Sequence, residues 1–130
     1  MSDPRTPGDA PLEVCLTLPA LADHARVARL AMAGMATRNG LSYDEVEDLR
    51  IAVGEVFALL VRHPDPTARI RLRCRVTDDE VGIEADRTPA VALDPVDELT
   101  TAILGAVVDE ATIDGPAARV VLVKRSEHPR

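Results

Sequence analysis

Hydrophobic residues recur with helical spacing between Ser42 and His63, and this segment has the clearest pattern in the chain. They stand three or four positions apart, so a helix gathers them on one side. They are Val46, Leu49, Val53, Val56 and Leu60. Ser42 followed by Glu45 has the spacing of a capping box, which predicts where the helix begins. Pro64 lies shortly beyond His63 and predicts its end, because proline lacks an amide hydrogen.

Strict alternation marks the predicted strands. Residues 12–18 alternate, with Leu12, Val14, Leu16 and Leu18 expected on one side. Residues 68–76 alternate more cleanly, and their apolar members are expected to face the helices. These are Ile70, Leu72, Cys74 and Val76. Asp78 and Asp79 predict a hairpin turn before a returning strand at 80–85, and residues 117–125 predict a last strand.

Two further segments have helical patterns. Pro19 is expected to open a helix that ends at Asn39-Gly40, since proline fits a first helical turn. Its buried side is expected to contain Leu21, Val27, Leu30, Met35 and the intervening alanines. Residues 96–112 predict a third helix, with Leu99, Ile103, Ala106 and Val107 on its buried side.

The order strand, two helices, two strands, helix, strand predicts an α+β fold. We expect a two-layer sandwich, a mixed and mostly antiparallel sheet with three helices on one face. The domain is expected to span residues 12–125, between a disordered leader at 1–11, rich in proline, aspartate and glycine, and a tail at 126–130.

Composition narrows the classes of function. The 130 residues suffice for one domain with its own core. A net charge of −7 argues against direct nucleic-acid binding, which needs a cationic surface. The chain has no apolar run long enough to cross a bilayer, so we expect a cytoplasmic protein without membrane contact. Cys15 and Cys74 are expected on opposite faces of the sheet, which predicts neither a disulfide nor a metal site.

Arginines fill the outward positions of the strand at 68–76: Arg69, Arg71, Arg73 and Arg75. One interpretation makes this row an anion-binding surface. The other makes it a solvated sheet face, on which the arginines pair with Glu13 and Glu84 of neighbouring strands.

A carboxylate, Glu55, stands among apolar neighbours in the helix at 42–63. It is either an exposed glutamate on the solvent side or a functional group. The segment DLRIAVGEVFALLVRH resembles a helix of the RsbW-like anti-sigma factors, which are serine kinases of the histidine-kinase-like (GHKL) ATPase superfamily. The matching residues are Asp48, Ala52, Val53, Glu55, Val61 and His63. The resemblance extends over nearly the whole chain and implies the histidine-kinase-like ATPase fold, with Glu55 as a relic of the family's catalytic base.

The residues that would hold a magnesium nucleotide are altered. Where the resemblance implies a metal-binding asparagine, this chain has Leu59, which has no oxygen to offer a cation. The adenine-contacting turn keeps one carboxylate, Asp86, and no glycine. The phosphate-binding glycines fall on Glu98 and Thr100, and the lid loop is lost. We therefore expect no cofactor and no metal; the alternative is ATP with magnesium.

The resemblance implies a transcription regulator of a stress response, which sequesters an RNA polymerase sigma factor by partner switching without kinase activity. Arg29 matches the sigma-contacting arginine, with Arg26 as its companion; the alternative makes Arg29 an exposed helix residue paired with Asp23 or another neighbour. Other implied partners are an anti-anti-sigma (STAS) protein and a second copy of the chain. The rival functions are an active serine/threonine kinase that phosphorylates an anti-sigma antagonist, and an adaptor for another regulatory protein. Met32 and Met35 are either adaptable surface or core.

Overall fold

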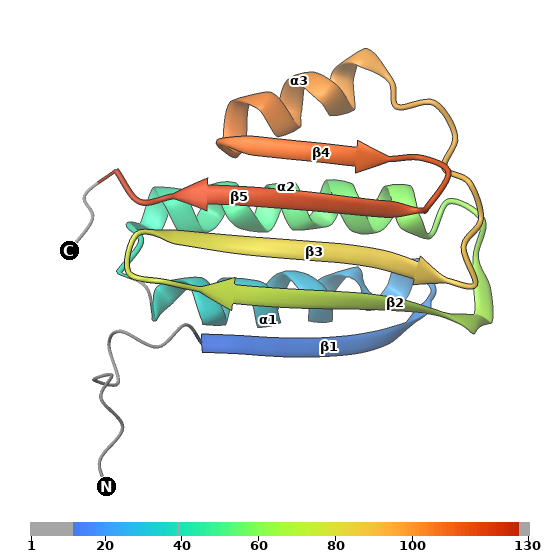
Figure 1. Ribbon diagram of the computed structural model, residues 1–130, viewed down its shortest axis with the longest axis horizontal. Helices are drawn as coiled ribbons and strands as arrows, with labels where there is room; N and C mark the ends of the chain where they lie inside the picture. Colours follow the sequence, from blue (N-terminus) through green and yellow to red (C-terminus); the bar gives the residue numbers. More distant parts are fainter. Residues whose placement is uncertain (1–11, 39, 128–130) are drawn as a thin grey trace, which may run out of the picture.

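The computed structural model describes residues 12–38 and 40–127, and in this part of the chain five strands form one sheet. The strands are β1 (Leu12–Ala20), β2 (Asp65–Val76), β3 (Glu80–Thr88), β4 (Glu110–Asp114) and β5 (Arg119–Arg125). Their order across the sheet is β1-β2-β3-β5-β4 (Figure 1). The helices are α1 (Ala25–Thr37), α2 (Tyr43–Leu60) and α3 (Glu98–Val107), with a short 3-10 turn, η1 (Ala22–His24), before α1.

The elements form two layers. Helices α1 and α2 lie side by side behind the sheet, while α3 lies beside β4 at the far edge and contacts both α2 and β4 (Figure 1). All the described strand pairings are antiparallel. The predicted α+β two-layer sandwich with three helices is therefore confirmed, but the described strands form an antiparallel sheet rather than a mixed one. No described helix has the length and apolar character to span a bilayer.

The core lies between the sheet and the α1–α2 pair. The inward residues of the predicted strands contribute to it, including Ile70, Leu72 and Cys74 of β2. Phe57 and Leu49 of α2 are almost completely buried against them. The capping box is also present: the Ser42 hydroxyl accepts from the Glu45 amide at 3.1 Å, and the Glu45 carboxylate accepts from the Ser42 amide at 2.8 Å. The sequence signals of α2 are thus confirmed.

The start of the first helix and the two large residues Val27 and Leu30 of its buried side were predicted wrongly, whereas the alanines of that side are confirmed. Pro19 belongs to β1, and α1 begins only at Ala25. Val27 and Leu30 are exposed, whereas α1 packs through Ala28, Met32, Ala33 and Ala36. The small alanines let α1 lie close to α2, so the large residues at 27 and 30 are left on the outer surface. Met32 is core, as one of the two interpretations held, and Met35 packs against the core. Asn39 lies outside the described residues.

The third helix was predicted too long. It ends at Val107, and residues 110–114 form β4, a strand that the periodicity did not reveal. Most of β4 is exposed, so it has no alternation of buried and exposed residues to signal a strand. The buried side was predicted only in part: Val107 packs against the core and Ile103 is partly buried, but Leu99 is 69% exposed, Ala106 is exposed, and the buried residue is Leu104.

The remaining sheet predictions hold on the described residues. Cys15 is exposed and Cys74 is buried, both as free thiols on opposite faces. Burial raises the pKa of the Cys74 thiol to about 11. The described elements run from Leu12 to Arg125, and beyond them the Glu127 amide donates to the Glu45 carboxylate at 2.8 Å. The predicted leader, residues 1–11, and the end of the predicted tail, residues 128–130, lie outside the described residues.

Candidate functional site

Helix α2 positions the residues that the sequence suggested for a nucleotide site. Leu59 lies in its last turn and is only 4% exposed, so a hydrocarbon side chain fills the position that the resemblance gives to a metal ligand. Glu55, one turn earlier, is partly buried and has no hydrogen bond or ion pair to the described part of the chain. Neither interpretation of Glu55 is decided by this placement.

Asp86 and Leu59 lie on opposite sides of the sheet. It stands opposite Arg71 in the β2–β3 ladder, on the sheet face that no helix covers, and its Oδ2 is 3.3 Å from the Arg71 guanidinium. Leu59 belongs to the helix layer behind the other face. The structure therefore separates the two positions by the thickness of the sheet. The other oxygen of Asp86, Oδ1, is buried without a partner in the described residues.

Arg87 takes the helix-facing place next to Asp86, and sequence analysis missed it. It stands opposite Ile70 in the β2–β3 ladder, and its guanidinium donates to the carbonyl of Leu60 at 2.9 Å. Arg87 is 5% exposed, so a cation fills the space between the end of β3 and the end of α2. Extending the alternation of 81, 83 and 85 by one step would have found it, because period two puts residue 87 on the same face.

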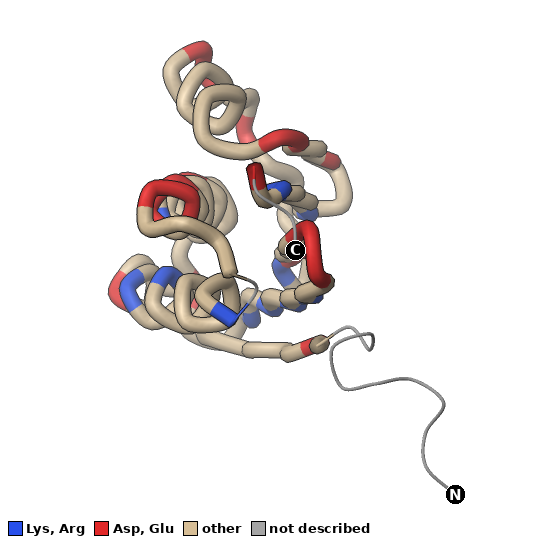
Figure 2. Tube along the Cα trace, turned by 90° about the vertical axis from the view of Figure 1, so that its left-hand side faces the viewer, with Lys and Arg blue, Asp and Glu red and all other residues tan. Residues whose placement is uncertain are grey.

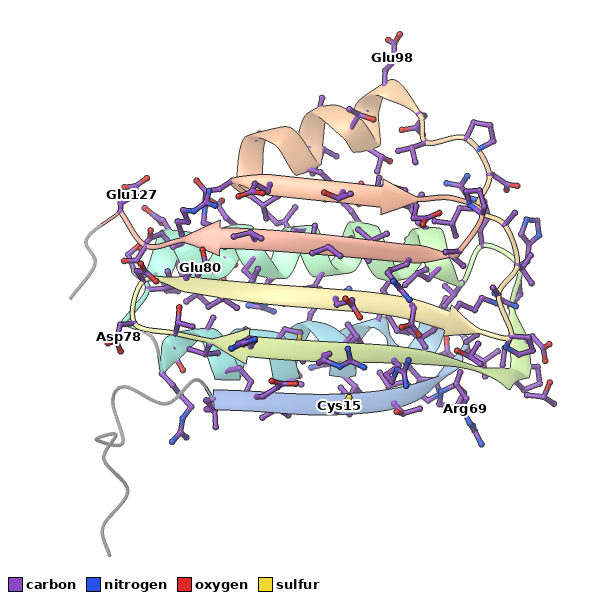
Figure 3. The ribbon with its side chains drawn as sticks, viewed as in Figure 1. Cys15, Arg69, Asp78, Glu80, Glu98 and Glu127 are labelled. Atoms are coloured by element: carbon purple, nitrogen blue, oxygen red, sulfur yellow. The ribbon has the colours of Figure 1, made fainter. Side chains whose placement is uncertain are left out.

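The first turn of α3 supplies the remaining predicted positions. Asp97 caps the helix, and its Oδ1 accepts from the Thr100 amide at 2.7 Å. Hydrogen bonds from the backbone amide and the side chain of Thr100 lower the pKa of the Asp97 carboxyl below its ordinary value. Glu98 projects outward from the helix (Figure 3). The amide of Thr100 thus already has a carboxylate partner, and the negative charges of Asp97 and Glu98 oppose a phosphate at this helix end.

These residues do not fit a magnesium nucleotide at the predicted positions. A hard cation needs oxygen ligands, and Leu59 offers none. The carboxylate of Asp86 faces the other side of the sheet, and the space beside Leu60 contains the charged group of Arg87. The first turn of α3 presents carboxylates where phosphate binding needs free amides.

The segment between β3 and α3 is tied to the rest of the domain. The carboxylate of Asp94 lies 3.2 Å from the His63 ring nitrogen and 3.7 Å from the Arg62 guanidinium, at the end of α2. The Leu93 amide donates to the Gly115 carbonyl at 2.9 Å, and the Leu93 side chain packs against the core. His63, which matched the resemblance, thus holds this connection in place.

Asp48, another matching residue, holds a buried cation. Lys124 of β5 is 9% exposed, and its Nζ lies 3.2 Å from the Asp48 carboxylate and 2.9 Å from the carbonyl of Val107. The ammonium group therefore joins α2 to the C-terminal end of α3, where the helix dipole favours positive charge.

The predicted partner-binding residues lie on α1. A Cβ atom placed on Gly54 of α2 would be 3.3 Å from Cδ and 3.6 Å from Nη1 of Arg29, so the Arg29 side chain lies across α2 at that glycine. Arg29 is partly buried there, and Arg26 is exposed. Neither has a hydrogen bond or ion pair to a described residue, so the alternative pairing of Arg29 with Asp23 is wrong.

The arginine row lies on the helix-free face of the sheet. Arg71 pairs with Asp86, and Arg73 pairs with Glu84 at 3.1 Å. Glu13 stands directly opposite Arg75 in the β1–β2 ladder. Cross-strand ion pairs thus occur on this face, as one of the two interpretations predicts.

Comparison with known proteins agrees with this architecture. A stretch of 48 residues is 42% identical to the serine-protein kinases RsbW of Bacillus cereus (strain AH187) and Bacillus thuringiensis (strain Al Hakam), covering 37% of this chain and 30% of each relative. The chain therefore spans about a third of the length of these relatives. A crystal structure of the RsbU and RsbW domains of Rv1364c from Mycobacterium tuberculosis has the same fold, with a TM-score of 0.66 and 19% identity, over 92% of this chain and 33% of that one.

The predicted resemblance to RsbW-like proteins is confirmed by these matches. The match to a family is longer still. Residues 18–119 match the histidine kinase-like ATPase domain, and they extend from the end of β1 to the start of β5. Most of the sheet and all three helices lie inside this range, so the chain belongs to the histidine kinase-like ATPase domain family.

Proposed function

We propose that this protein is an anti-sigma-like regulator, which binds and sequesters an RNA polymerase sigma factor without binding ATP or acting as a kinase. The proposal rests on the similarity to the RsbW proteins and on the residues at the altered nucleotide positions. An anti-anti-sigma protein is the partner expected to release the sigma factor.

The observation that carries the binding role is the placement of Arg29. Its side chain is held over Gly54 at the junction of two packed helices, yet its guanidinium has no described partner. Every charged residue of α1 is an arginine, in a protein of net charge −7. Arginine forms bidentate pairs with carboxylates and often anchors interfaces. We therefore assign Arg29, with Arg26, to an acidic residue of the sigma factor.

The chemistry of the nucleotide positions supports the proposed absence of kinase function. Phosphoryl transfer depends on metal ions that neutralise the phosphates and on positioned donors. Leu59, Arg87 and the capped first turn of α3 do not supply these groups. Glu55 is then a relic of the family's base, and Glu55→Ala is expected to leave sigma binding intact.

A two-fold dimer belongs to the same proposal. Strand β1 is an edge of the sheet among the described residues, and an unprotected edge tends to find a partner. Isologous pairing is the usual solution for such a surface. Light scattering should give about twice the monomer mass of 14.0 kDa. A single mass of 14.0 kDa across micromolar concentrations contradicts the dimer without affecting the sigma assignment.

The test of sigma binding uses purified sigma factors from the same cell and a charge reversal at Arg29. Arg29→Glu is expected to weaken binding by roughly 2–5 kcal/mol, because it puts like charges together in the interface. The matched control is Arg69→Glu, an exposed arginine on the helix-free face of the sheet, which should bind like the wild type. Undiminished binding by folded Arg29→Glu dismisses this residue. Failure of the wild type to bind any of the sigma factors dismisses the function.

The test of nucleotide binding is a thermal-shift titration with ATP or ADP and magnesium. We expect no saturable rise of the melting temperature below about 1 mM nucleotide, an affinity near −4.1 kcal/mol. A saturating shift in that range would show that the nucleotide site is intact and would favour the kinase function of the relatives. The two tests are independent, since Arg29 lies on α1 and the altered positions lie at the ends of α2, β3 and α3.

A further inference from the structure

We propose that the groove between α3 and β4 binds an extended segment of a partner protein, rich in alternating apolar and basic residues, which adds as a strand to the edge of β4. This inference goes beyond the sigma-binding role, since the groove lies at the opposite edge of the sheet from β1 and does not include α1.

The groove is a defined hollow of about 220 Å³. One wall comes from α3 and the residue after it, and the other comes from the helix-facing side of β4. The residues that line it include Thr101, Leu104, Gly105, Val108, Ala111 and Ile113. Most of these side chains are apolar or small, so the groove can take apolar side chains of the size of valine.

The edge of β4 supplies the backbone groups for a new strand. Strand β4 is the last strand in the order β1-β2-β3-β5-β4, and among the described residues it pairs only with β5. Its other side therefore offers amides and carbonyls that a further strand can bind. In strand addition the main chain supplies affinity, and alternate side chains enter a neighbouring pocket. A strand along β4 would point every second side chain toward the α3 groove.

Helix α3 is apolar but largely uncovered. Leu104 is its only buried residue, whereas Leu99 is 69% exposed. Gly105 faces the groove, and a Cβ atom there would have no heavy atom within 4 Å. Glycine in an exposed helix interior is less stable than alanine. No crowding within the described residues requires this glycine, and its missing side chain keeps the groove open.

The charge around the groove selects the occupant. Every charged residue from Asp97 to Asp114 is acidic. Figure 2 shows the same bias, with red and no blue positions along α3. Glu98 projects from the free side of the helix (Figure 3) and has no described ion pair. The other side chains of such a strand point to the helix-free face, where β4 contributes Asp114 and Glu110, and Glu110 pairs with Arg125. An apolar segment that alternates with lysine or arginine therefore turns its apolar side chains toward the groove and its basic side chains toward these carboxylates.

The experiment measures binding of a fluorescein-labelled peptide of alternating valine and lysine by fluorescence polarisation. Its matched peptides replace lysine by glutamate or place a proline in the centre. The variant Gly105→Phe fills the groove, and Gly34→Phe is its control, because Gly34 is also an exposed helix glycine with open space above it. Circular dichroism verifies that each variant is folded.

We expect the valine–lysine peptide to bind the wild type and Gly34→Phe equally, and Gly105→Phe about tenfold or more weakly. The glutamate and proline peptides should not bind. Amide hydrogen exchange on the unaltered protein should slow in β4 when the peptide is present, and this measurement needs no variant.

Three outcomes overturn the proposal. The first is no binding of the valine–lysine peptide up to about 1 mM, the weak limit for a specific contact. The second is binding that Gly105→Phe leaves unchanged, or that leaves amide exchange in β4 unchanged, since the peptide then binds elsewhere. The third is a dimer of the protein that Gly105→Phe dissociates, which would assign the groove to a second copy of this chain.

Discussion

Helices α2 and α3 are both rich in apolar residues, but the fold uses them differently. Half of the residues of α2 are buried between α1 and the sheet, whereas α3 buries Leu104 alone. Helix α2 packs on the sheet between α1 and α3, while α3 lies at the end of the sheet beside the last strand (Figure 1). An apolar stripe therefore shows which side of a helix is suited to burial, but the topology decides whether anything covers it.

The difference also separates two kinds of function. On the α1–α2 side, the side chain of Arg29 occupies the space that a side chain at Gly54 would fill, so the domain itself uses the space left by this glycine. On the α3 side, Gly105 accommodates nothing in the described residues. We infer that the α1–α2 region presents a surface whose side chains are held in place, which we call the shaped surface, whereas the α3–β4 region leaves an open groove. Three pairs of substitutions test this contrast.

The largest expected effect compares two leucines. Leu49 of α2 has no exposed surface, and Leu49→Ala should cost roughly 3–5 kcal/mol of unfolding free energy through lost burial and the cavity that remains. Leu99→Ala in α3 should change it by less than about 0.5 kcal/mol, because that side chain is 69% exposed. Urea unfolding of both variants measures the two values. A large loss for Leu99→Ala would mean that something covers α3, and a small loss for Leu49→Ala would contradict the core as described.

The parts of the fold that the sequence predicted well are those with two independent signals. Helix α2 has both a capping box and a clean apolar period, and β2 has strict alternation of arginine with apolar residues. The α3–β4 region has neither. Its helix is apolar on several sides, and β4 is an exposed edge strand held by its pairing with β5. Pairing between strands is a tertiary contact, so local periodicity does not reveal it.

The candidate site shows the same division. The resemblance predicted Leu59, Glu98 and Thr100 as altered positions from the sequence alone, because the chemistry of a leucine or a glutamate does not depend on its placement. The orientation of Asp86 does depend on placement, and only the strand register shows that it faces Arg71 while Arg87 faces the helices. The packing of the Arg29 side chain over Gly54 could likewise not be predicted from the sequence, because it depends on how two helices pack against each other.

The second comparison concerns the acidic groups that begin α2 and α3. Burial opposes the charge of Glu45, but the amides of Ser42 and Glu127 donate to it, and together the contacts lower its pKa below the ordinary value of 4.5. Glu45→Gln should therefore cost about 1–2 kcal/mol at neutral pH. Because folding lowers the pKa of Glu45, its charged form stabilises the folded protein at pH values above the ordinary pKa of the group. This contribution is lost as the pH falls through the pKa that Glu45 has in the folded protein.

Unfolding curves at pH 7 and pH 3 measure this dependence. The difference in unfolding free energy between the wild type and Glu45→Gln should be larger at pH 7 than at pH 3. Asp97→Ala removes the exposed cap of α3 and should have a smaller effect on global unfolding, since α3 contributes less to the core. If this difference for Glu45→Gln is the same at both pH values, the charge of Glu45 does not contribute to the stability of the fold.

The smallest effects come from the two glycines, and they test the contrast most directly. Gly105→Ala should stabilise the protein by about 0.5–1 kcal/mol, because alanine is the better helix former and its Cβ meets nothing. Gly54→Ala should gain less, since the new Cβ would lie 3.3 Å from Cδ of Arg29 and that side chain must move. The double variant Arg29→Ala with Gly54→Ala removes the obstacle and should restore the full gain from alanine. Urea unfolding of the four proteins in this cycle isolates the coupling between the two residues. If Gly54→Ala gains as much with Arg29 present as with Arg29 removed, Arg29 does not rest on this glycine, and the shaped surface assigned to α1 and α2 loses its basis.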